Sequence, residues 1–300
     1  MFNINLPPQF QDFITIFLSI FVEAMPFVIL GSLVSALIGL FIKEEWILKL
    51  IPKNRLFSHA LMPFLGIAFP VCECGNVPVA KRLLFKGVQI SQVLTFILAA
   101  PAFNFIVFIA TYSAFKDSIS IVFFRFLFTY IIAVTIGILF SLKKNPDEIL
   151  QSNFANEVAC HHDHTKKSLK NFSSDLLDDF SQMLASLVIG ALIASALQNF
   201  TPIDILKSLG QNPIISILIM IIIAFVISIC SNVDAFVALS YSSRFTSGSI
   251  VSFLVFGPMI DIKSLSMLST IFTKRFLILM TSLVFALTFI LSLILNFYIF

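Results

Sequence analysis

The feature that most constrains this chain is a series of apolar runs, each about 20 residues long. Helices of that length cross the hydrocarbon core of a bilayer, and the runs are too continuous for the alternating strands of a membrane barrel. Charged residues make up only 12% of the 300, whereas a soluble domain carries roughly 25%. The sequence therefore predicts an all-α polytopic protein of the inner (plasma) membrane, with multiple passes. The stretch 1–12 has no basic residue to start a signal peptide, so we expect the first run to be a retained span.

The apolar pattern predicts about eight membrane segments in two related halves. A polar stretch, 143–175, divides a first membrane repeat, 1–142, from a second, 176–300, and is expected to be a cytoplasmic linker. Two of the segments contain helix-breaking or polar residues and are expected to be broken. The segments are 12–42, 58–80 (broken), 88–113, 119–142, 176–199, 213–240 (broken), 247–270 and 276–298.

Three short matches, in the same order and at nearly constant offset, relate the two halves. They pair a glycine in an early span, an Asn-Val dipeptide in the broken segment, and a proline followed three residues later by an amide or a carboxylate. The paired positions are Gly31 with Gly190, Asn76 with Asn232, and Pro101 with Pro258. Ordered matches at a fixed offset indicate an internal duplication.

The distribution of Lys and Arg distinguishes two topologies. If all eight segments cross the membrane, the loop Lys and Arg residues divide almost equally between the two sides. If the broken segments are re-entrant hairpins, only Lys116, Lys207 and Arg244 lie outside. Because basic loops tend to stay in the cytoplasm, the second arrangement is favoured. Each half then has three crossings, so the halves are predicted to be inverted repeats whose broken helices meet near the midplane.

One stretch, Phe69–Pro78 (FPVCECGNVP), places two thiols, a carboxylate and an amide inside an apolar segment. Interrupted membrane helices with polar groups at the break mark transporter substrate sites. Thiolates are soft ligands that favour Cu(I), Zn(II) or trivalent arsenic-like species. The alternative is that these are small packing residues, with the amides satisfying freed backbone groups. The predicted substrate-binding residues are Cys72, Glu73, Cys74, Asn76 and Asn104 in the first half, with Cys230 and Asn232 in the second.

Carboxylates in membrane segments are costly and tend to mark proton or ion pathways. Asp261 is the leading candidate for proton coupling, followed by Asp234 and Glu23. The alternative for Asp261 is an ion pair with Lys263 near the cytoplasmic end of its span. Arg125 is expected to extend its charge to the outer face.

The linker carries a compact group of metal-capable side chains, Cys160, His161, His162 and His164. They are a candidate low-affinity metal site, and the alternative is a solvated loop. The chain has no phosphate-binding loop, nucleophile elbow or zinc-protease motif, so we expect neither an enzyme nor a cofactor. Its basic residues form no nucleic-acid footprint. The expected partners are the lipid bilayer and a small-molecule or metalloid substrate. A homo-oligomer is compatible with the sequence.

The chain resembles the bacterial predicted-permease family that includes the organoarsenical (methylarsenite) efflux permeases of the ArsP type. The resemblance rests on Phe69–Pro78 with the following VAKRLL, on AAPAFN at 99–104 and on FGPMIDIK at 256–263. It implies a polytopic inner-membrane permease of two related halves, with the cysteine motif in the membrane and export as the direction of transport.

The sequence therefore predicts a permease that exports a small soft solute or metal(loid) species through a site at the two broken helices, with proton coupling. One alternative is a membrane thiol redox or sensor protein that cycles Cys72 and Cys74 between dithiol and disulfide. Another is a non-transporting subunit of a membrane complex.

Overall fold

The computed structural model describes residues 8–41, 52, 54–68, 72–142, 149–152, 154, 169–200 and 212–298. Nearly all of their regular structure is helical, apart from an isolated β-bridge between Leu150 and Phe272. The all-helical prediction is confirmed for the part of the chain described. The helices of the first half are α1 (Pro8–Phe41), α3 (Arg55–Leu61), the short 3₁₀ turn η1 (Met62–Phe64), α4 (Leu65–Ala68), α5 (Glu73–Phe85), α6 (Ile90–Ala99), α7 (Phe105–Ala114) and α8 (Ile119–Ser141). Those of the second half are α10 (Leu169–Phe200), α12 (Pro213–Ile227), α13 (Asp234–Tyr241), α14 (Ser247–Met259), α15 (Ile262–Leu268) and α16 (Lys274–Tyr298).

Five stretches of the described helices are long and apolar enough to cross a membrane, by length and composition. They are Phe10–Gly39, Ile119–Ser141, Phe180–Asn199, Ser247–Leu268 and Lys274–Tyr298. Three shorter apolar helices, α6, α7 and α12, accompany them. The protein is thus a multi-pass helical membrane protein, whereas eight membrane segments remain a prediction.

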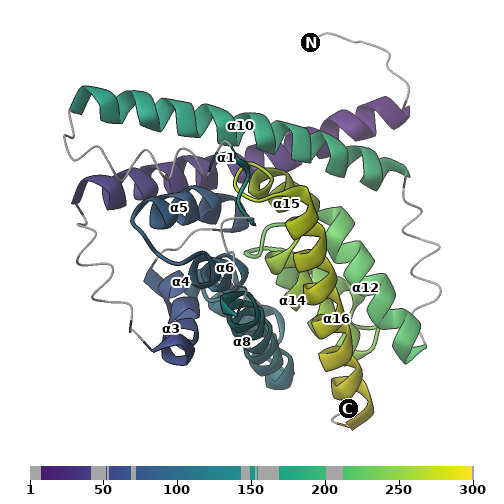
Figure 1. Ribbon diagram of the computed structural model, residues 1–300. Coiled ribbons are helices and arrows are strands. Elements are labelled where there is room, and N and C mark those ends of the chain that lie inside the picture. The colour runs from purple at the N-terminus through teal and green to yellow at the C-terminus, as the bar shows by residue number, and fades with distance from the viewer. Residues whose placement is uncertain are drawn as a thin grey trace.

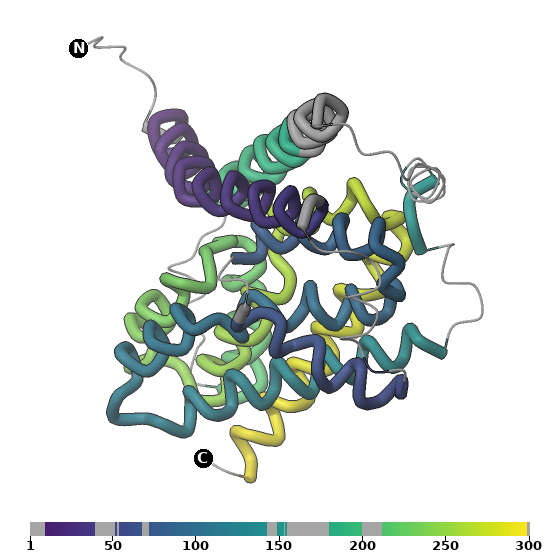
Figure 2. The backbone as a smooth tube through the Cα atoms, turned by 90° about the vertical axis from the view of Figure 1, so that its left-hand side faces the viewer, coloured from purple at the N-terminus to yellow at the C-terminus, as the bar shows by residue number. Residues whose placement is uncertain are grey.

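Helices α1 and α10 lie side by side along one face of the molecule, as Figures 1 and 2 show. Helix α5 packs against α1, and α15 packs against α10, so these two short helices lie between the long pair and the remaining bundle (Figure 1). The face of α1 turned away from the bundle is apolar and exposed, with Val22 66% exposed and Leu33 53% exposed. Exposed aliphatic side chains on a membrane helix are suited to contact with lipid.

Glycines allow the long helices α1 and α10 to pack closely against the short helices α5 and α15. A Cβ atom built on Gly31 of α1 would lie 2.6 Å from the Cα atom of Gly75 in α5. A Cβ atom built on Gly190 of α10 would lie 2.9 Å from the Cα atom of Lys263 in α15. Small residues permit this close approach of backbones, which is common between membrane helices. Both glycines matched in the sequence therefore lie at close helix contacts, Gly31 against α5 and Gly190 against α15.

The two segments expected to be broken are interrupted where the sequence placed the breaks. Helix α4 ends at Ala68 and α5 begins at Glu73, with 69–71 outside the described residues. Helix α12 ends at Ile227 and α13 begins at Asp234. Both interruptions bring backbone polar groups and thiols to the ends of helices.

Two segments that were not expected to be broken, 88–113 and 247–270, are interrupted as well. The first is divided between α6 and α7, and the second between α14 and α15. At each interruption a polar side chain caps the new helix: Asn104 Oδ1 accepts from the backbone N–H of Ile106, and Asp261 Oδ1 accepts from that of Ser264. These caps satisfy N–H groups that a helix start otherwise leaves unpaired.

Helix α10 begins at Leu169, within the stretch 143–175 that is expected to be a linker. The described start of the linker packs against the bundle. Phe154 is buried with its ring 5.3 Å from that of Phe85, and the backbone N–H of Gln151 donates to the carbonyl of Ile271 at 2.8 Å.

Candidate functional site

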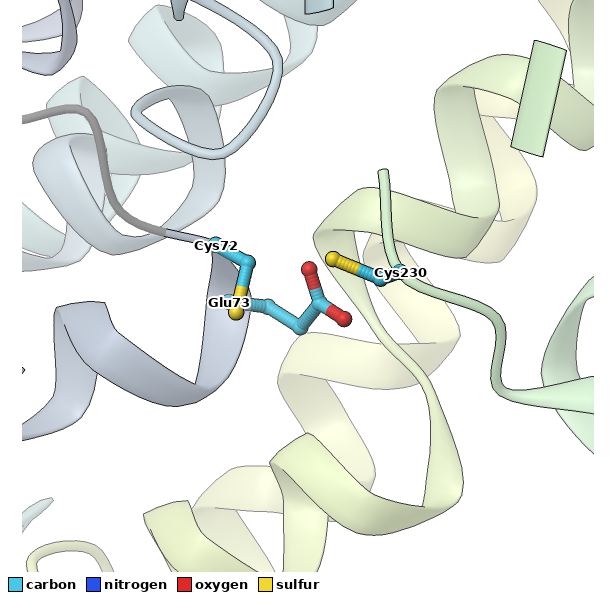
Figure 3. Close-up of side chains that lie close together, drawn as sticks. All are labelled: Cys72, Glu73 and Cys230. Atoms are coloured by element: carbon cyan, nitrogen blue, oxygen red, sulfur yellow. The ribbon is translucent and has the colours of Figure 1, made fainter. Parts of the chain in front are cut away.

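The two main helix breaks meet at a cluster of two thiols and a carboxylate. Cys72, Glu73 and Cys230 each offer one ligand atom, and these atoms lie within 4.8 Å of one another. All three residues are buried. Figure 3 shows the Glu73 side chain extending from the start of α5 toward Cys230 in the second half. The structure thus brings together three of the residues that the sequence singled out. Their role in binding a substrate remains a prediction.

The start of α5 positions the first-half ligands. Cys72 precedes the helix in an extended conformation, and its carbonyl accepts the backbone N–H of Asn76 at 3.1 Å. Glu73 is the first helical residue, where the dipole of the helix favours a negative charge. Cys74 is also buried but is not part of the three-residue cluster.

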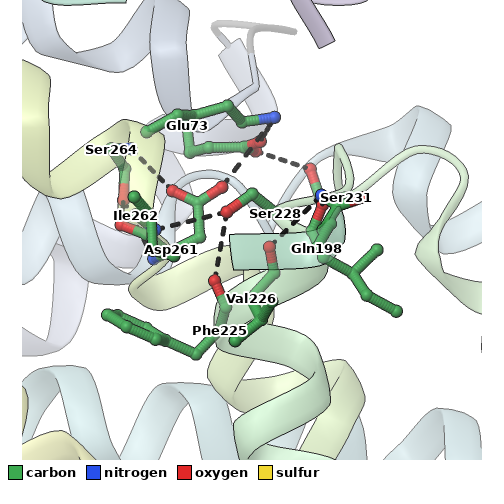
Figure 4. Close-up of polar contacts among 11 residues, drawn as sticks. Glu73, Gln198, Phe225, Val226, Ser228, Ser231, Asp261, Ile262 and Ser264 are labelled. Carbon is green, nitrogen blue, oxygen red and sulfur yellow. Dashed lines mark hydrogen bonds and ion pairs between the residues drawn. The ribbon is translucent and has the colours of Figure 1, made fainter. Parts of the chain in front are cut away.

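The second-half break is held by side chains from neighbouring helices (Figure 4). The residue that follows α12, Ser228, has a φ of 50°, which is left-handed and uncommon for a residue other than glycine. The Gln198 amide of α10 donates to the last carbonyls of α12, those of Val226 at 3.2 Å and Ile227 at 2.8 Å. The backbone N–H of Ile262 donates to Ser228 Oγ at 3.3 Å, which joins this break to the one before α15.

Lys263 brings a positive charge to the cluster. Its Nζ lies 3.1 Å from Glu73 Oε1 and 3.8 Å from Asp261 Oδ2, and its side chain is fully buried. The hydroxyl of Ser231 lies 3.5 Å from the other oxygen of Glu73 (Figure 4). Glu23 of α1 lies close enough to interact electrostatically with Lys263 and Glu73. Three carboxylates and one ammonium group therefore surround the thiols.

Several buried polar atoms at the breaks have no hydrogen-bond partner. Asn76 is fully buried, yet the oxygen and the nitrogen of its side-chain amide have no partner. The side-chain oxygen of Asn232, Oδ1, has no partner either. The same holds for Asp261 Oδ2. Unpaired buried polar groups are rare because each costs about 1–3 kcal/mol. Three of these atoms, those of Asn76 and Asn232, lie at matched positions of the two halves, which is consistent with a site that receives a polar or charged ligand.

Two of the predicted site residues have other partners. Asn104 caps α7 with its side chain. Asp234 forms a two-contact ion pair with Arg125 of α8, at 3.0 Å and 2.7 Å, and Arg125 also donates to Thr111 at 2.8 Å. The expectation that Arg125 extends to the outer face is wrong, because its side chain is fully buried.

The predicted linker site, formed by Cys160, His161, His162 and His164, lies outside the described residues. Sequence reasoning did not single out His59, which is buried with its Nδ1 2.9 Å from Thr95 Oγ1. It belongs to no metal-capable cluster among the described residues. The presence of a histidine in an apolar segment was the feature of the sequence that could have drawn attention to His59.

The donor set of the cluster favours soft ligands. Two sulfur atoms and one carboxylate oxygen suit Zn(II), Cu(I) or a related soft ion better than a hard cation such as Mg²⁺, which prefers oxygen alone. Three protein ligands leave coordination positions open, as a site that releases its ligand requires.

A family model described as "Predicted permease" matches residues 9–297. The UPF0718 protein YcgR of Bacillus subtilis is similar, with 38% identity over 272 residues that cover 91% of this chain and 92% of that protein. A putative two-component membrane permease complex subunit of Streptococcus mutans is 36% identical over 285 residues, 93% of this chain and 92% of the relative. No solved structure matches the chain.

Proposed function

The chain belongs to the predicted-permease family, and we propose that it carries a small soft solute or metal(loid) species across the plasma membrane. The protein acts as a transporter rather than as an enzyme. Its substrate binds between the two halves, at Cys72, Glu73 and Cys230, and reaches either side of the membrane by alternating access.

The single observation that carries this proposal is the cluster itself. Its ligands come from the ends of two broken helices in different halves of the chain, and their ligand atoms lie within 4.8 Å of one another. In transporters of known plan, substrates bind at such breaks between repeated halves. A thiol pair that joins two separate halves is suited to a ligand that must be released when the halves move.

An inverted-repeat plan fits the packing of the short helices. Helix α5 of the first half contacts α15 of the second, and α7 contacts α13. By the sequence matches, α5 is the equivalent of α13, and α7 is the equivalent of α15. Exchange of the two halves therefore converts the α5–α15 contact into the α13–α7 contact. Asn104 and Asp261, equivalent in the repeat, both cap the helix that follows. We include re-entrant breaks and inverted halves in the proposal on this basis.

Export and proton coupling are further parts of the proposal. Asp261 and Glu23 lie beside the cluster and are the carboxylates suited to proton coupling. Asp234 is less suited to that role, because both of its oxygens bind Arg125.

A second candidate function, that of a subunit in a two-component permease, is favoured by the printed description of the Streptococcus mutans relative. A partner protein in stoichiometric amount after gentle purification would support it. The redox alternative depends on Cys72 and Cys74, yet the cluster pairs Cys72 with Cys230.

The test is solute accumulation in cells that express the wild type, Cys72→Ser, Cys230→Ser or Cys74→Ser. The panel contains Cu, Zn, Cd, arsenite and methylarsenite. We expect one solute to accumulate less with the wild type, and Cys72→Ser and Cys230→Ser to abolish the difference. Cys74→Ser is the matched control and should retain most of the effect. Equal loss with Cys72→Ser and Cys74→Ser, and none with Cys230→Ser, would support the redox protein instead.

A further inference from the structure

Negative charge exceeds positive charge around the cluster. Glu23, Asp234 and Asp261 each interact electrostatically with Glu73, and the cations that face these carboxylates are Lys263 and Arg125. Arg125 binds both oxygens of Asp234. Within the part of the chain that the structure describes, one ammonium group is therefore shared by three carboxylates. A buried excess of negative charge is costly unless a cation or protons compensate it.

Lys263 already pairs with the carboxylate of Glu73, which a cation bound in the cluster would need as a ligand. Its Nζ lies 3.1 Å from Glu73 Oε1, and this is the carboxylate that completes the cluster with Cys72 and Cys230. A cation in the cluster and the ammonium group would repel each other across one carboxylate. They cannot both make close contact with it without a large electrostatic penalty.

A second acceptor for the ammonium group is already in place. Asp261 Oδ2 is 3.8 Å from Lys263 Nζ, is buried, and has no hydrogen-bond partner. The other oxygen of Asp261 is fixed by the backbone N–H of Ser264 at 2.6 Å, as Figure 4 shows. A small change in the lysine side chain would therefore move its charge from Glu73 to Asp261 without moving the backbone.

We propose that the substrate of this site is a positively charged soft metal ion, and that Lys263 is its tethered competitor. Binding of the ion to Cys72, Glu73 and Cys230 transfers the ammonium group from Glu73 to Asp261. The inference rests on the proposed function and narrows it, because a neutral species such as arsenous acid needs the thiols but does not compete with an ammonium group for Glu73.

The test measures binding of Cd²⁺ and Zn²⁺ to purified full-length protein, by calorimetry and by the ultraviolet absorption of cadmium–thiolate bonds. The key variant is Lys263→Met/Asp261→Asn. It removes the competitor while leaving the summed charge of Glu73, Asp261 and Lys263 unchanged. We expect it to bind Cd²⁺ at least about tenfold more tightly than the wild type, since the repulsion between two nearby buried charges is lost.

Asp261→Asn alone should have the opposite effect. The ammonium group then has no second carboxylate and stays on Glu73, so Cd²⁺ affinity should fall about tenfold or more. Lys263→Arg keeps the charge and should bind no more tightly than the wild type. Thermal unfolding of each variant is measured in parallel, so that a loss of binding through misfolding is recognised.

The two levels of the proposal fail in different ways. If Cys72→Ser/Cys230→Ser leaves Cd²⁺ binding unchanged, the thiol site of the proposed function is wrong. If binding is thiol-dependent but the lysine and aspartate variants do not change it in opposite directions, only the competition is wrong. Thiol-dependent binding of arsenite with none of Cd²⁺ or Zn²⁺ would likewise overturn the cationic substrate and leave the permease proposal standing.

Discussion

Arg125 and Asp234, 109 residues apart in the chain, form a fully buried ion pair with two contacts that links α8 of the first half to α13 of the second. Both groups are removed from water, so each depends on the other for compensation of its charge. The pair joins the halves through residues that are not members of the three-residue thiol cluster.

Loss of one partner of this pair should destabilise the protein more than loss of both. Asp234→Ala leaves the Arg125 guanidinium buried and uncompensated, and we expect it to lower the free energy of unfolding by about 3–5 kcal/mol. Arg125→Met/Asp234→Leu should recover most of that loss. Chemical unfolding in detergent measures both variants. A double variant no more stable than Asp234→Ala would contradict the pairing.

The contact between α1 and α5 should not tolerate a methyl group at Gly31. The added Cβ would lie 2.6 Å from the Cα atom of Gly75, so Gly31→Ala must push two backbones apart. We expect a loss of about 1–3 kcal/mol, typical of overpacking. Gly257→Ala is the control, because its Cβ would make an ordinary contact of 3.6 Å with Ala224. Equal thermal midpoints for the two variants would show that α1 is not pressed against α5.

A substitution at Asn76 should affect transport without lowering the stability of the fold. Its buried amide has no partner, so Asn76→Leu is expected to leave the free energy of unfolding unchanged or to raise it. The same change should abolish the difference in solute accumulation if the amide contacts the substrate. Thr95→Val is the comparison, since Thr95 is buried and forms hydrogen bonds to His59 and Ser91. This change should lower the free energy of unfolding by about 1 kcal/mol. Full transport by Asn76→Leu would remove the residue from the site.

Gln198 should stabilise the break that carries Cys230. Gln198→Leu removes the donor to the carbonyls of Val226 and Ile227, and we expect a cost of about 1–3 kcal/mol. Backbone hydrogen exchange over 228–233 should become faster. Gln182→Leu is the control, because Gln182 lies on the same helix but contacts Lys81 instead. Unchanged exchange over 228–233 in Gln198→Leu would contradict this role.

The helices and the two main breaks could be predicted because their causes are local. Long apolar runs determine helices in a membrane, and CECGNVP and SICSNVD are visibly polar within them. The breaks after Pro101 and Pro258 were missed, since a single proline is tolerated within membrane helices. Capping by Asn104 and Asp261 decided the outcome there.

The residue types of the site could be predicted, but their partners could not. Cys72, Glu73 and Cys230 were singled out by chemistry, and the structure brings them together. That Lys263 pairs with Glu73, and Arg125 with Asp234, depends on helices that are distant in the chain. Neither periodicity nor spacing in one sequence encodes such contacts.

The length of α1 has a consequence for the surrounding lipid. Its apolar stretch, Phe10–Gly39, has 30 residues, about 45 Å of helix against a hydrocarbon core of about 30 Å. A helix longer than the hydrocarbon core is accommodated by tilting, by kinking or by local thickening of the bilayer, and α1 contains Pro26, a residue at which helices kink. Because α1 carries both Glu23 and the glycine pressed against α5, its inclination is coupled to the thiol cluster. We therefore expect the thickness of the host membrane to influence the geometry of the thiol cluster through α1.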